Sequence, residues 1–400
     1  MLAPMDHVAG GAAASRLVDE GRRREPPRAA GSAVEESPVL PDYGGACLSE
    51  VVPALLGRDR SGSPAWLPDA ARRAEQVVLL VLDGLGYEQL LERRSLAPVL
   101  ASMAGGPITS VAPTTTATAL TSLATGLAPS DHGVVGYRVA TRRGVLNVLK
   151  WATPAGDARA SIPPDQFQPH AAFRGRACPV VSRAEFAGSG FTEAHLRGSR
   201  LVGWRVASSL PVDVAALIAE GEPLVYAYYD GIDKVAHDTG LGAHYDAELR
   251  AVDRLVEDLA AVLPVGAALV VTADHGQVEV RDAPLEIDAE ISQDVVQFSG
   301  EGRFRWLHVS PGATENVAER CRQRYGDVAW VRTRDEIVAQ RWLGDPPSPE
   351  VERRLGDVAL VARAPVAFFD PSDTGELRLV SRHGSVTAAE MLVPLLATGS

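Results

Sequence analysis

The stretch VVLLVLDG, residues 77–84, decides the fold, because six consecutive apolar residues end at Asp83. A run this short and this apolar predicts a strand that is buried on both faces, as in a parallel sheet covered by helices. A second run, ALVVTADHG at residues 268–276, ends at Asp274 and His275. Ligands bind beyond the carboxyl ends of parallel strands, so these polar residues are expected at a binding site.

Strand and helix patterns alternate around these two runs. The expected strands are 76–82, 108–112, 224–229 and 267–272, and the expected helices are 48–57, 88–103, 116–124 and 244–262. This alternation predicts an α/β fold with a mainly parallel central sheet and helices on both faces. Residues 1–40 lack apolar periodicity and are expected to form a disordered tail, followed by one domain over residues 45–400.

Two segments interrupt the alternation. Residues 137–200 begin with a hairpin pattern and continue as a Pro-rich irregular stretch, and residues 281–305 form a second insertion. Either insertion is expected to cover the site, and residues 137–200 are assigned as a small inserted cap.

Composition excludes several classes of protein. The net charge of −12 and the scattered arginines argue against a nucleic-acid polymer as partner, because such a partner needs a basic stripe. Three widely spaced cysteines form no disulfide framework and suit a reducing compartment. No apolar run reaches membrane-spanning length, and the N-terminus lacks an apolar signal core. A cytoplasmic location without a membrane partner is therefore expected, whereas the oligomeric state stays open.

Seven polar residues predict a two-metal site. Asp233 and His237 are four residues apart, so a helical turn would place them on one face. With His383 they offer two imidazoles and one carboxylate, a set that is typical of catalytic zinc. The second set consists of residues at the ends of two expected strands and at the start of an expected helix. Its members are Asp83, Asp274, His275 and Thr116. Two such sets suit an in-line displacement at phosphorus.

Thr116 is the expected nucleophile. A threonine hydroxyl is barely ionised at neutral pH, and metal coordination would activate it. Its place at the start of a predicted helix adds backbone N–H groups for a phosphoryl oxygen. Hydrolysis through a phosphothreonine intermediate is therefore expected.

The order of these motifs resembles the alkaline phosphatase superfamily, and within it the type I phosphodiesterase/nucleotide pyrophosphatase family. The matching segments are DG at 83–84, PTTT at 113–116, TGLAPSDHG at 125–133, DKVAH at 233–237, ADHG at 273–276 and His383. In the family a TG stretch follows the attacking Thr by nine residues, which selects Thr116 over Thr114 and Thr115.

The resemblance covers most of residues 76–395. It implies two zinc ions, with other divalent cations also possible, and hydrolysis of a small-molecule phosphoester substrate. The chain departs from the family pattern at Ala117, Ala119 and Ala236, where an aromatic residue, Asn and Gly are common. These departures leave the metal ligands in place and leave the preference for nucleotides open.

Each motif also has a structural interpretation. Asp83 could cap a turn, residues 114–118 could be a helix N-cap region, and Asp233 with His237 could be a surface pair. His132 is assigned a structural role in ordering the loop after Gly126. The remaining residues expected on the surface near Asp233 are Asp230, Asp238 and His244.

Four other functions compete with the phosphodiesterase. A phosphomonoesterase would need an arginine clamp, for which Arg138, Arg142 and Arg143 are candidates. A phosphosugar mutase would carry a larger insertion than residues 137–200. A sulfatase lacks support because no C/S-x-P-x-R segment is present. A non-catalytic metal-binding scaffold would retain the ligands without turnover.

Overall fold

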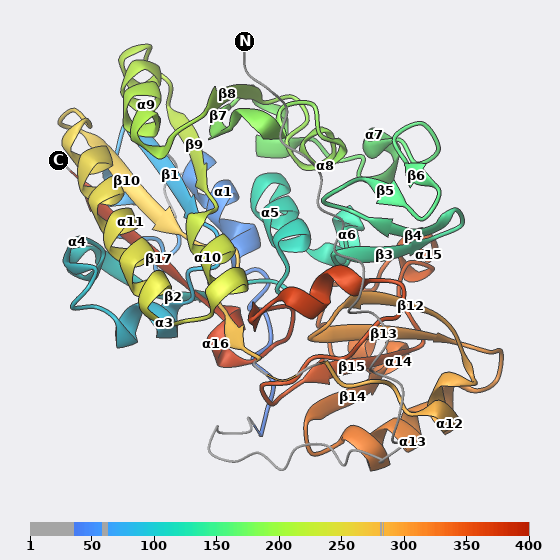
Figure 1. The fold of residues 1–400 in the computed structure, drawn as a ribbon. Coiled ribbons are helices and arrows are strands. Elements are labelled where there is room, and N and C mark those ends of the chain that lie inside the picture. The colour runs from blue at the N-terminus through green and yellow to red at the C-terminus, as the bar shows by residue number, and fades with distance from the viewer. Residues whose placement is uncertain (1–35, 58–62, 281, 283, 400) are drawn as a thin grey trace, which may run out of the picture.

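The computed structural model describes residues 36–57, 63–280, 282 and 284–399. In this part of the chain a seven-stranded sheet has the order β2-β17-β10-β1-β9-β7-β8 (Figure 1). Its strands are β1 (Gln76–Leu82), β2 (Ala104–Thr109), β7 (Pro179–Arg183), β8 (Arg200–Trp204), β9 (Leu224–Tyr229), β10 (Ala267–Thr272) and β17 (Leu392–Gly399).

The central strands run parallel. β1 pairs in parallel with β10 on one side and with β9 on the other, and β7 continues the parallel order to β8. β17 runs antiparallel to both β10 and β2. The predicted α/β fold with a mainly parallel sheet is therefore confirmed, with β17 as the antiparallel member.

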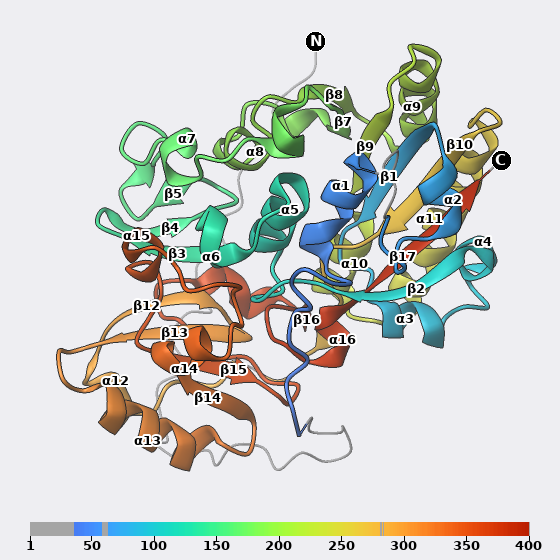
Figure 2. The same cartoon turned by 180° about the vertical axis from the view of Figure 1, so that it is seen from behind.

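Helices cover both faces of this sheet. α9 (Leu210–Ala219) and α11 (Ala243–Ala261) lie in front of it in Figure 1, and α1 (Leu48–Leu56), α2 (Asp69–Arg73) and α5 (Thr116–Thr125) lie in front in the reverse view of Figure 2. The shorter helices of this part of the chain are α3 (Tyr87–Glu92), α4 (Pro98–Ser102), α6 (Pro129–His132), α10 (Gly231–Thr239) and α16 (Ala388–Met391).

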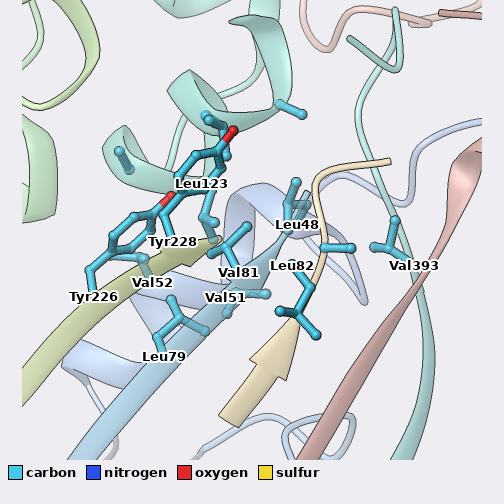
Figure 3. Close-up of a cluster of buried hydrophobic side chains, with 14 of the residues drawn as sticks. Leu48, Val51, Val52, Leu79, Val81, Leu82, Leu123, Tyr226, Tyr228 and Val393 are labelled. Atoms are coloured by element: carbon cyan, nitrogen blue, oxygen red, sulfur yellow. The ribbon is translucent and has the colours of Figure 1, made fainter. Parts of the chain in front are cut away.

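The core between α1, α5 and the sheet explains why β1 is wholly apolar. Figure 3 shows Leu79 and Val81 of β1 packing with Val52 of α1 and Leu123 of α5. Alternate residues of a strand point to opposite faces, so Val78 and Leu80 face the other helix layer. Both faces are covered, and residues 77–82 are fully buried.

The prediction of one continuous helix over residues 88–103 is wrong. The structure divides it into α3 and α4, with Pro98 at the first turn of α4. A proline lacks the N–H that a continuing helix needs and disfavours the helical conformation in the residue before it. Ala97 accordingly has φ −130° and ψ 64°, and the chain turns between the two helices.

The strand expected at 108–112 is displaced toward the N-terminus. Its ladder with β17 runs from Ala104 to Thr109 and includes Gly105 and Pro107, residues that usually indicate a break in a strand. Beyond Thr109 the backbone N–H of Ser110 donates to the carbonyl oxygen of Met391 at 2.7 Å, outside the ladder.

The segment 137–200 is divided between two sheets. A hairpin of β3 (Arg138–Thr141) and β4 (Gly144–Asn147) continues into β5 (Ala152–Thr153) and β6 (Gly156–Asp157), followed by α7 (Pro164–Phe167) and α8 (Gly190–His195). β7, however, lies within the expected insertion and pairs with β9 in the central sheet. The assignment of the whole segment as a cap therefore differs from the structure.

The second insertion is larger than residues 281–305. A four-stranded antiparallel sheet combines β12 (Val295–Glu301), β13 (Phe304–Val309), β14 (Ala329–Thr333) and β15 (Val358–Ala362). Its helices are α12 (Ala289–Ser292), α13 (Thr314–Tyr325), α14 (Arg334–Ala339) and α15 (Pro349–Glu352). This sheet has its own apolar cluster, which includes Leu307, Val317, Leu360 and Phe368. A short pair, β11 (Val278–Glu279) and β16 (Ser381–Arg382), leads back to the central sheet.

Two further expectations concern the N-terminal tail and membrane-spanning segments. Most of the expected tail, residues 1–40, lies outside the described residues. Among the residues that the structure describes, no helix has both the length and the apolar character needed to cross a bilayer.

Candidate functional site

The seven predicted site residues meet at the carboxyl edge of the central sheet. Asp83 directly follows β1, and Asp274 follows β10 after one further residue. Asp233 lies in α10, which begins at the end of β9, and Thr116 is the first residue of α5. The remaining members are His237, on the same helix as Asp233, His275, next to Asp274, and His383, directly after β16.

One group of ligand atoms centres on His275. Oδ1 of Asp83 lies 3.4 Å from Nε2 of His275, and Oδ2 of Asp274 lies 3.5 Å from the same nitrogen. The ligand atoms of these three residues lie within 4.8 Å of one another. The Thr116 hydroxyl lies 3.1 Å from Nε2 of His275. A hydroxyl, an imidazole and two carboxylates therefore converge on one point.

The two carboxylates carry an electrostatic cost that a cation would offset. Within the described chain, Asp83 Oδ1 and Asp274 Oδ2 are buried and have no hydrogen-bond partner. Burial, followed by repulsion from Asp274, holds the pKa of the Asp83 carboxyl well above its usual value, and burial also raises the pKa of Asp274. Buried charges normally are paired or coordinate metals, so these orphaned oxygens fit a divalent cation.

A second group of ligand atoms joins Asp233 to the histidines. Its Oδ1 lies 3.3 Å from Nε2 of His237 and 3.8 Å from Nε2 of His383. The ligand atoms of Asp233, His275 and His383 lie within 4.8 Å of one another, so His275 is common to both groups. The rings of His275 and His383 stack at 3.5 Å between centroids.

The three imidazoles share one orientation, in which Nδ1 faces a backbone carbonyl oxygen. The distances are 2.7 Å from His237 to Ser381, 2.8 Å from His383 to Thr114 and 3.0 Å from His275 to Gly276. A carbonyl oxygen accepts but does not donate, so Nδ1 carries the proton and Nε2 presents a lone pair to the site. Burial and the neighbouring imidazoles hold the pKa of His383 well below its ordinary value, which keeps that ring neutral.

The PTTT segment is tied to the loop that carries His383. The Thr114 hydroxyl donates to the carbonyl oxygen of Ser385 at 2.6 Å and accepts from the backbone N–H of Gly384 at 3.1 Å. Thr115 then adopts an extended conformation as the N-cap of α5, and Thr116 occupies the first helical position. The first N–H groups of a helix lack intrahelical acceptors, so a phosphoryl oxygen beside Thr116 would meet free donors.

Three further residues support the site and were not predicted. The Tyr228 hydroxyl donates to Oδ2 of Asp83, and the Gln277 amide donates to Oδ1 of Asp233 at 2.6 Å. The backbone N–H of Gly84 donates to Oδ1 of Asp274 at 3.1 Å. Gly84 has φ +76°, and a Cβ there would lie 2.9 Å from the Gln277 amide nitrogen, so a side chain would displace this contact.

Of two residues near the site, Asp230 differs from its expected surface position, whereas His132 has the structural role that was expected. Asp230 was expected on the surface, but it is 3% exposed and accepts from Arg183 at 2.8 Å, with Lys234 2.6 Å away. It is the N-cap residue of α10, which carries two site residues. His132 has the expected structural environment: its Nε2 lies 2.8 Å from the Ser122 hydroxyl, and burial lowers its pKa to about 3.

The fold and the site together define an α/β protein with candidate metal-ligand groups at the carboxyl edge of a mainly parallel sheet. The model of the type I phosphodiesterase/nucleotide pyrophosphatase family matches residues 77–386, and the chain belongs to this family. No curated protein matches the chain. Family membership supports the hydrolysis of phosphoric esters.

Solved structures share the fold at low sequence identity. Murine ectonucleotide pyrophosphatase/phosphodiesterase 5, as an inactive variant with AMP, is 16% identical over 81% of this chain and 88% of that chain, with a TM-score of 0.60. The human protein of the same name gives the same identity, coverage and TM-score. Phosphonoacetate hydrolase from Sinorhizobium meliloti, in complex with phosphonoacetate, is 17% identical over 81% of this chain and 90% of that chain, with a TM-score of 0.57.

Proposed function

We propose that the protein is a two-metal phosphodiesterase or nucleotide pyrophosphatase in which Thr116 attacks phosphorus. The observation that carries this proposal is the Thr116 hydroxyl, at the start of α5 and 3.1 Å from Nε2 of His275, a residue that is common to both ligand groups. A hydroxyl placed there meets the acceptor atoms that activate a nucleophile and the helix donors that bind a phosphoryl oxygen.

The donor set fits two divalent cations, for which zinc is the first choice because three of the ligands are imidazoles. Asp83, Asp274 and His275 would hold one cation with the Thr116 hydroxyl. The other would bind to Asp233, His237 and His383. When bound, two such ions lower the pKa of an attacking hydroxyl and neutralise charge on the leaving oxygen.

The protein's own groups position the reacting atoms. Thr116 would form a phosphothreonine with release of the leaving group, and water would then cleave this ester. The N–H groups at the start of α5 would orient the phosphoryl oxygens through both steps. Tyr228 holds the Asp83 carboxylate from the side away from His275, because its hydroxyl occupies Oδ2 while Oδ1 faces the imidazole.

The state of the cap arginines favours a diester over a monoester. Arg138, a candidate clamp for the extra charge of a monoester, is buried and forms ion pairs with Asp370 at 2.8 Å and Asp373 at 3.4 Å. A guanidinium engaged in this way is not available to a substrate. Arg142 and Arg143 line a separate hollow at the far end of β3.

The nucleophile can be tested directly with two threonine variants. Thr116→Ala is expected to reduce turnover of bis(p-nitrophenyl) phosphate by about a thousandfold or more, as losses of catalytic nucleophiles do. Thr118→Ala is the matched control, because within the described chain its buried hydroxyl on the same helix has no hydrogen-bond partner. Full activity in Thr116→Ala would remove this residue from its proposed role.

Substrate class and metal dependence need a panel of esters. It comprises mono- and bis(p-nitrophenyl) phosphate, a dinucleotide and phosphonoacetate, each with and without a chelator. The proposal predicts a higher kcat/KM for the diester, loss of activity on chelation, and a phosphorylated Thr116 in quenched samples. Two bound metal ions without turnover of any ester would instead support a non-catalytic scaffold.

A further inference from the structure

A second hollow lies apart from the metal-ligand groups, where the two small sheets meet. It is lined by residues of the β3–β4 hairpin, α7, β12, β13 and α15, and its volume is about 810 Å³. Figures 1 and 2 show β3, β4 and α15 on the same side of the molecule as β12, and α9 and α4 on the opposite side. The volume lies in the range of sites for small ligands and cofactors.

Arginine dominates the charge of this hollow. Arg142, Arg143, Arg353 and Arg354 line it, and among its described lining residues Glu350 is the one acidic side chain. The chain as a whole carries a net charge of −12. A concentration of positive charge inside a concave surface therefore runs against the overall field of the molecule and would attract an anion from solution.

The four guanidinium groups differ in their availability. Arg354 is buried and held in place: it donates to the carbonyl oxygens of Gly133 at 2.7 Å and Phe167 at 3.0 Å, and it pairs with Glu350 at 2.9 Å. The other three side chains, those of Arg142, Arg143 and Arg353, are solvent-exposed.

No carboxylate in the described ranges lies within ion-pair distance of these three exposed arginines, which are Arg142, Arg143 and Arg353. The hollow therefore has one arginine at its wall, Arg354, that is held in place by hydrogen bonds. Three exposed arginines at its rim have no carboxylate partner among the described residues. Glu350, the one acidic group, is already committed to Arg354.

We propose that this hollow binds a small anion with two or more phosphoryl groups. Guanidinium forks match phosphate oxygens in bidentate geometry, and several forks around one cavity exceed what a single carboxylate or phosphate needs. The concave shape favours a small molecule over a nucleic-acid polymer, which would need a longer basic stripe. This inference goes beyond the proposed function, because none of the seven ligand residues takes part.

The hollow is connected to the metal-ligand groups through β3. At the start of this strand, the backbone N–H of Tyr137 donates to Glu301 at 3.0 Å, and the Glu301 side chain packs against Gly384, the neighbour of His383. β3 then runs for four residues, roughly 13 Å, to the turn that carries Arg142. The anion is therefore either the distal end of an extended substrate or a separate phosphorylated molecule.

A binding experiment tests the hollow without depending on turnover. The α,β-methylene analogue of ADP carries two phosphoryl groups and resists cleavage between them. In titration calorimetry of the metal-loaded protein it is expected to occupy two classes of site, one at the metal-ligand groups and one at the hollow. The double variant Arg142→Gln/Arg353→Gln should weaken the second class by about tenfold or more, because each charge-assisted hydrogen bond contributes at least that factor.

The matched control removes the same charge elsewhere. Arg94 and Arg254 are exposed and far from the hollow in the fold, so Arg94→Gln/Arg254→Gln should retain both classes of binding. A single class of site in the native protein, or the same affinities in both double variants, would overturn the proposal.

The two sources of the anion give different kinetics. If the hollow binds the distal end of the substrate, Arg142→Gln/Arg353→Gln should raise the KM of a dinucleoside polyphosphate and leave that of bis(p-nitrophenyl) phosphate unchanged. If a separate molecule binds, both KM values should stay the same while the second class of analogue binding is lost. Failure of the proposed function is distinct, since native protein would then hydrolyse neither ester.

Discussion

Uncharged donors hold the acidic groups of the site. Tyr228 and Gln277 each occupy one carboxylate, on Asp83 and Asp233 respectively, without adding charge. Such partners fix the orientation of ligand side chains and are known to influence metal affinity. Neither donor residue belongs to the metal-binding motifs, so these motifs alone do not identify Tyr228 or Gln277.

Tyr228→Phe is expected to weaken metal binding while the fold is retained. The substitution keeps the ring but removes the donor to Oδ2 of Asp83, so the carboxylate loses its orientation. Metal affinity, measured by competition with a chromogenic chelator, should fall by about 10- to 100-fold. Tyr226→Phe is the control, since within the described chain the buried Tyr226 hydroxyl has no hydrogen-bond partner and its loss should leave the affinity unchanged.

His132 should make stability depend on pH. Burial lowers its pKa to about 3, so the unfolded chain binds a proton more readily than the folded protein does. Stability is therefore lost as the pH falls below the unfolded value of about 6.5, by about 1.4 kcal/mol for each pH unit. Between pH 7 and pH 5 the native protein should lose about 2 kcal/mol more than His132→Gln in urea unfolding. Equal losses in the two proteins would contradict this assignment.

At the scale of elements, a buried ion pair joins the second sheet to the central domain. Arg303, between β12 and β13, binds Glu390 of α16 through two hydrogen bonds of 2.8 and 2.7 Å, and both side chains are fully buried. Glu390 also accepts from the backbone N–H of Ser385 at 2.9 Å. The pair therefore supports the loop that begins at His383.

Arg303→Met is expected to destabilise the protein strongly. It would leave the Glu390 carboxylate buried without its cation, and removal of one partner of a buried pair costs about 3 to 5 kcal/mol. The free energy of unfolding from denaturant titration measures this loss. Arg73→Met, which removes an exposed partner of Asp69, should produce no measurable change. Similar stability of the two variants would show that the pair contributes little.

The elements that the sequence predicts best are those whose apolar pattern is local. β1, β9 and β10 have the predicted bounds because each is a continuous apolar run between turn residues. β7 escaped prediction because its short run lies within a Pro-rich stretch, and only pairing with β9 places it in the sheet. The antiparallel sheet of β12 to β15 likewise depends on partners that are distant in sequence.

At the scale of the whole molecule, the site draws its residues from most of the chain. The sequence predicts these seven residues because motif spacing preserves their order, and the structure brings them together at one edge. Their roles as ligands and nucleophile remain predictions. Tyr228 and Gln277 were missed because their contacts arise from the meeting of strand ends, which no local pattern records. Gly84 belongs to the DG motif, but its contact with Asp274 was not predicted.

Removal of metal should lower the thermal stability of the entire protein. Without a cation, Asp83 and Asp274 keep two buried oxygens that lack partners, and a ligand that binds only the folded state stabilises it by mass action. At a free metal concentration of one hundred times Kd, this linkage amounts to about 2.7 kcal/mol. Thermal unfolding with and without chelator measures the difference, and addition of zinc should restore the original midpoint. An unchanged midpoint after complete chelation would contradict metal binding at these residues.

The position of β17 has a consequence for how the chain matures on the ribosome. β17 lies between β10 and β2, so β2, an edge strand made early in translation, lacks its ladder partner until residues 392–399 emerge, and only Thr109 can bridge to Cys47 before then. Until then the sheet is only partly assembled, and β2 and β10 expose unpaired backbone groups. This condition favours association between nascent chains. Truncation within β17 would thus remove the ladder partner of β2 even though every predicted ligand is already present.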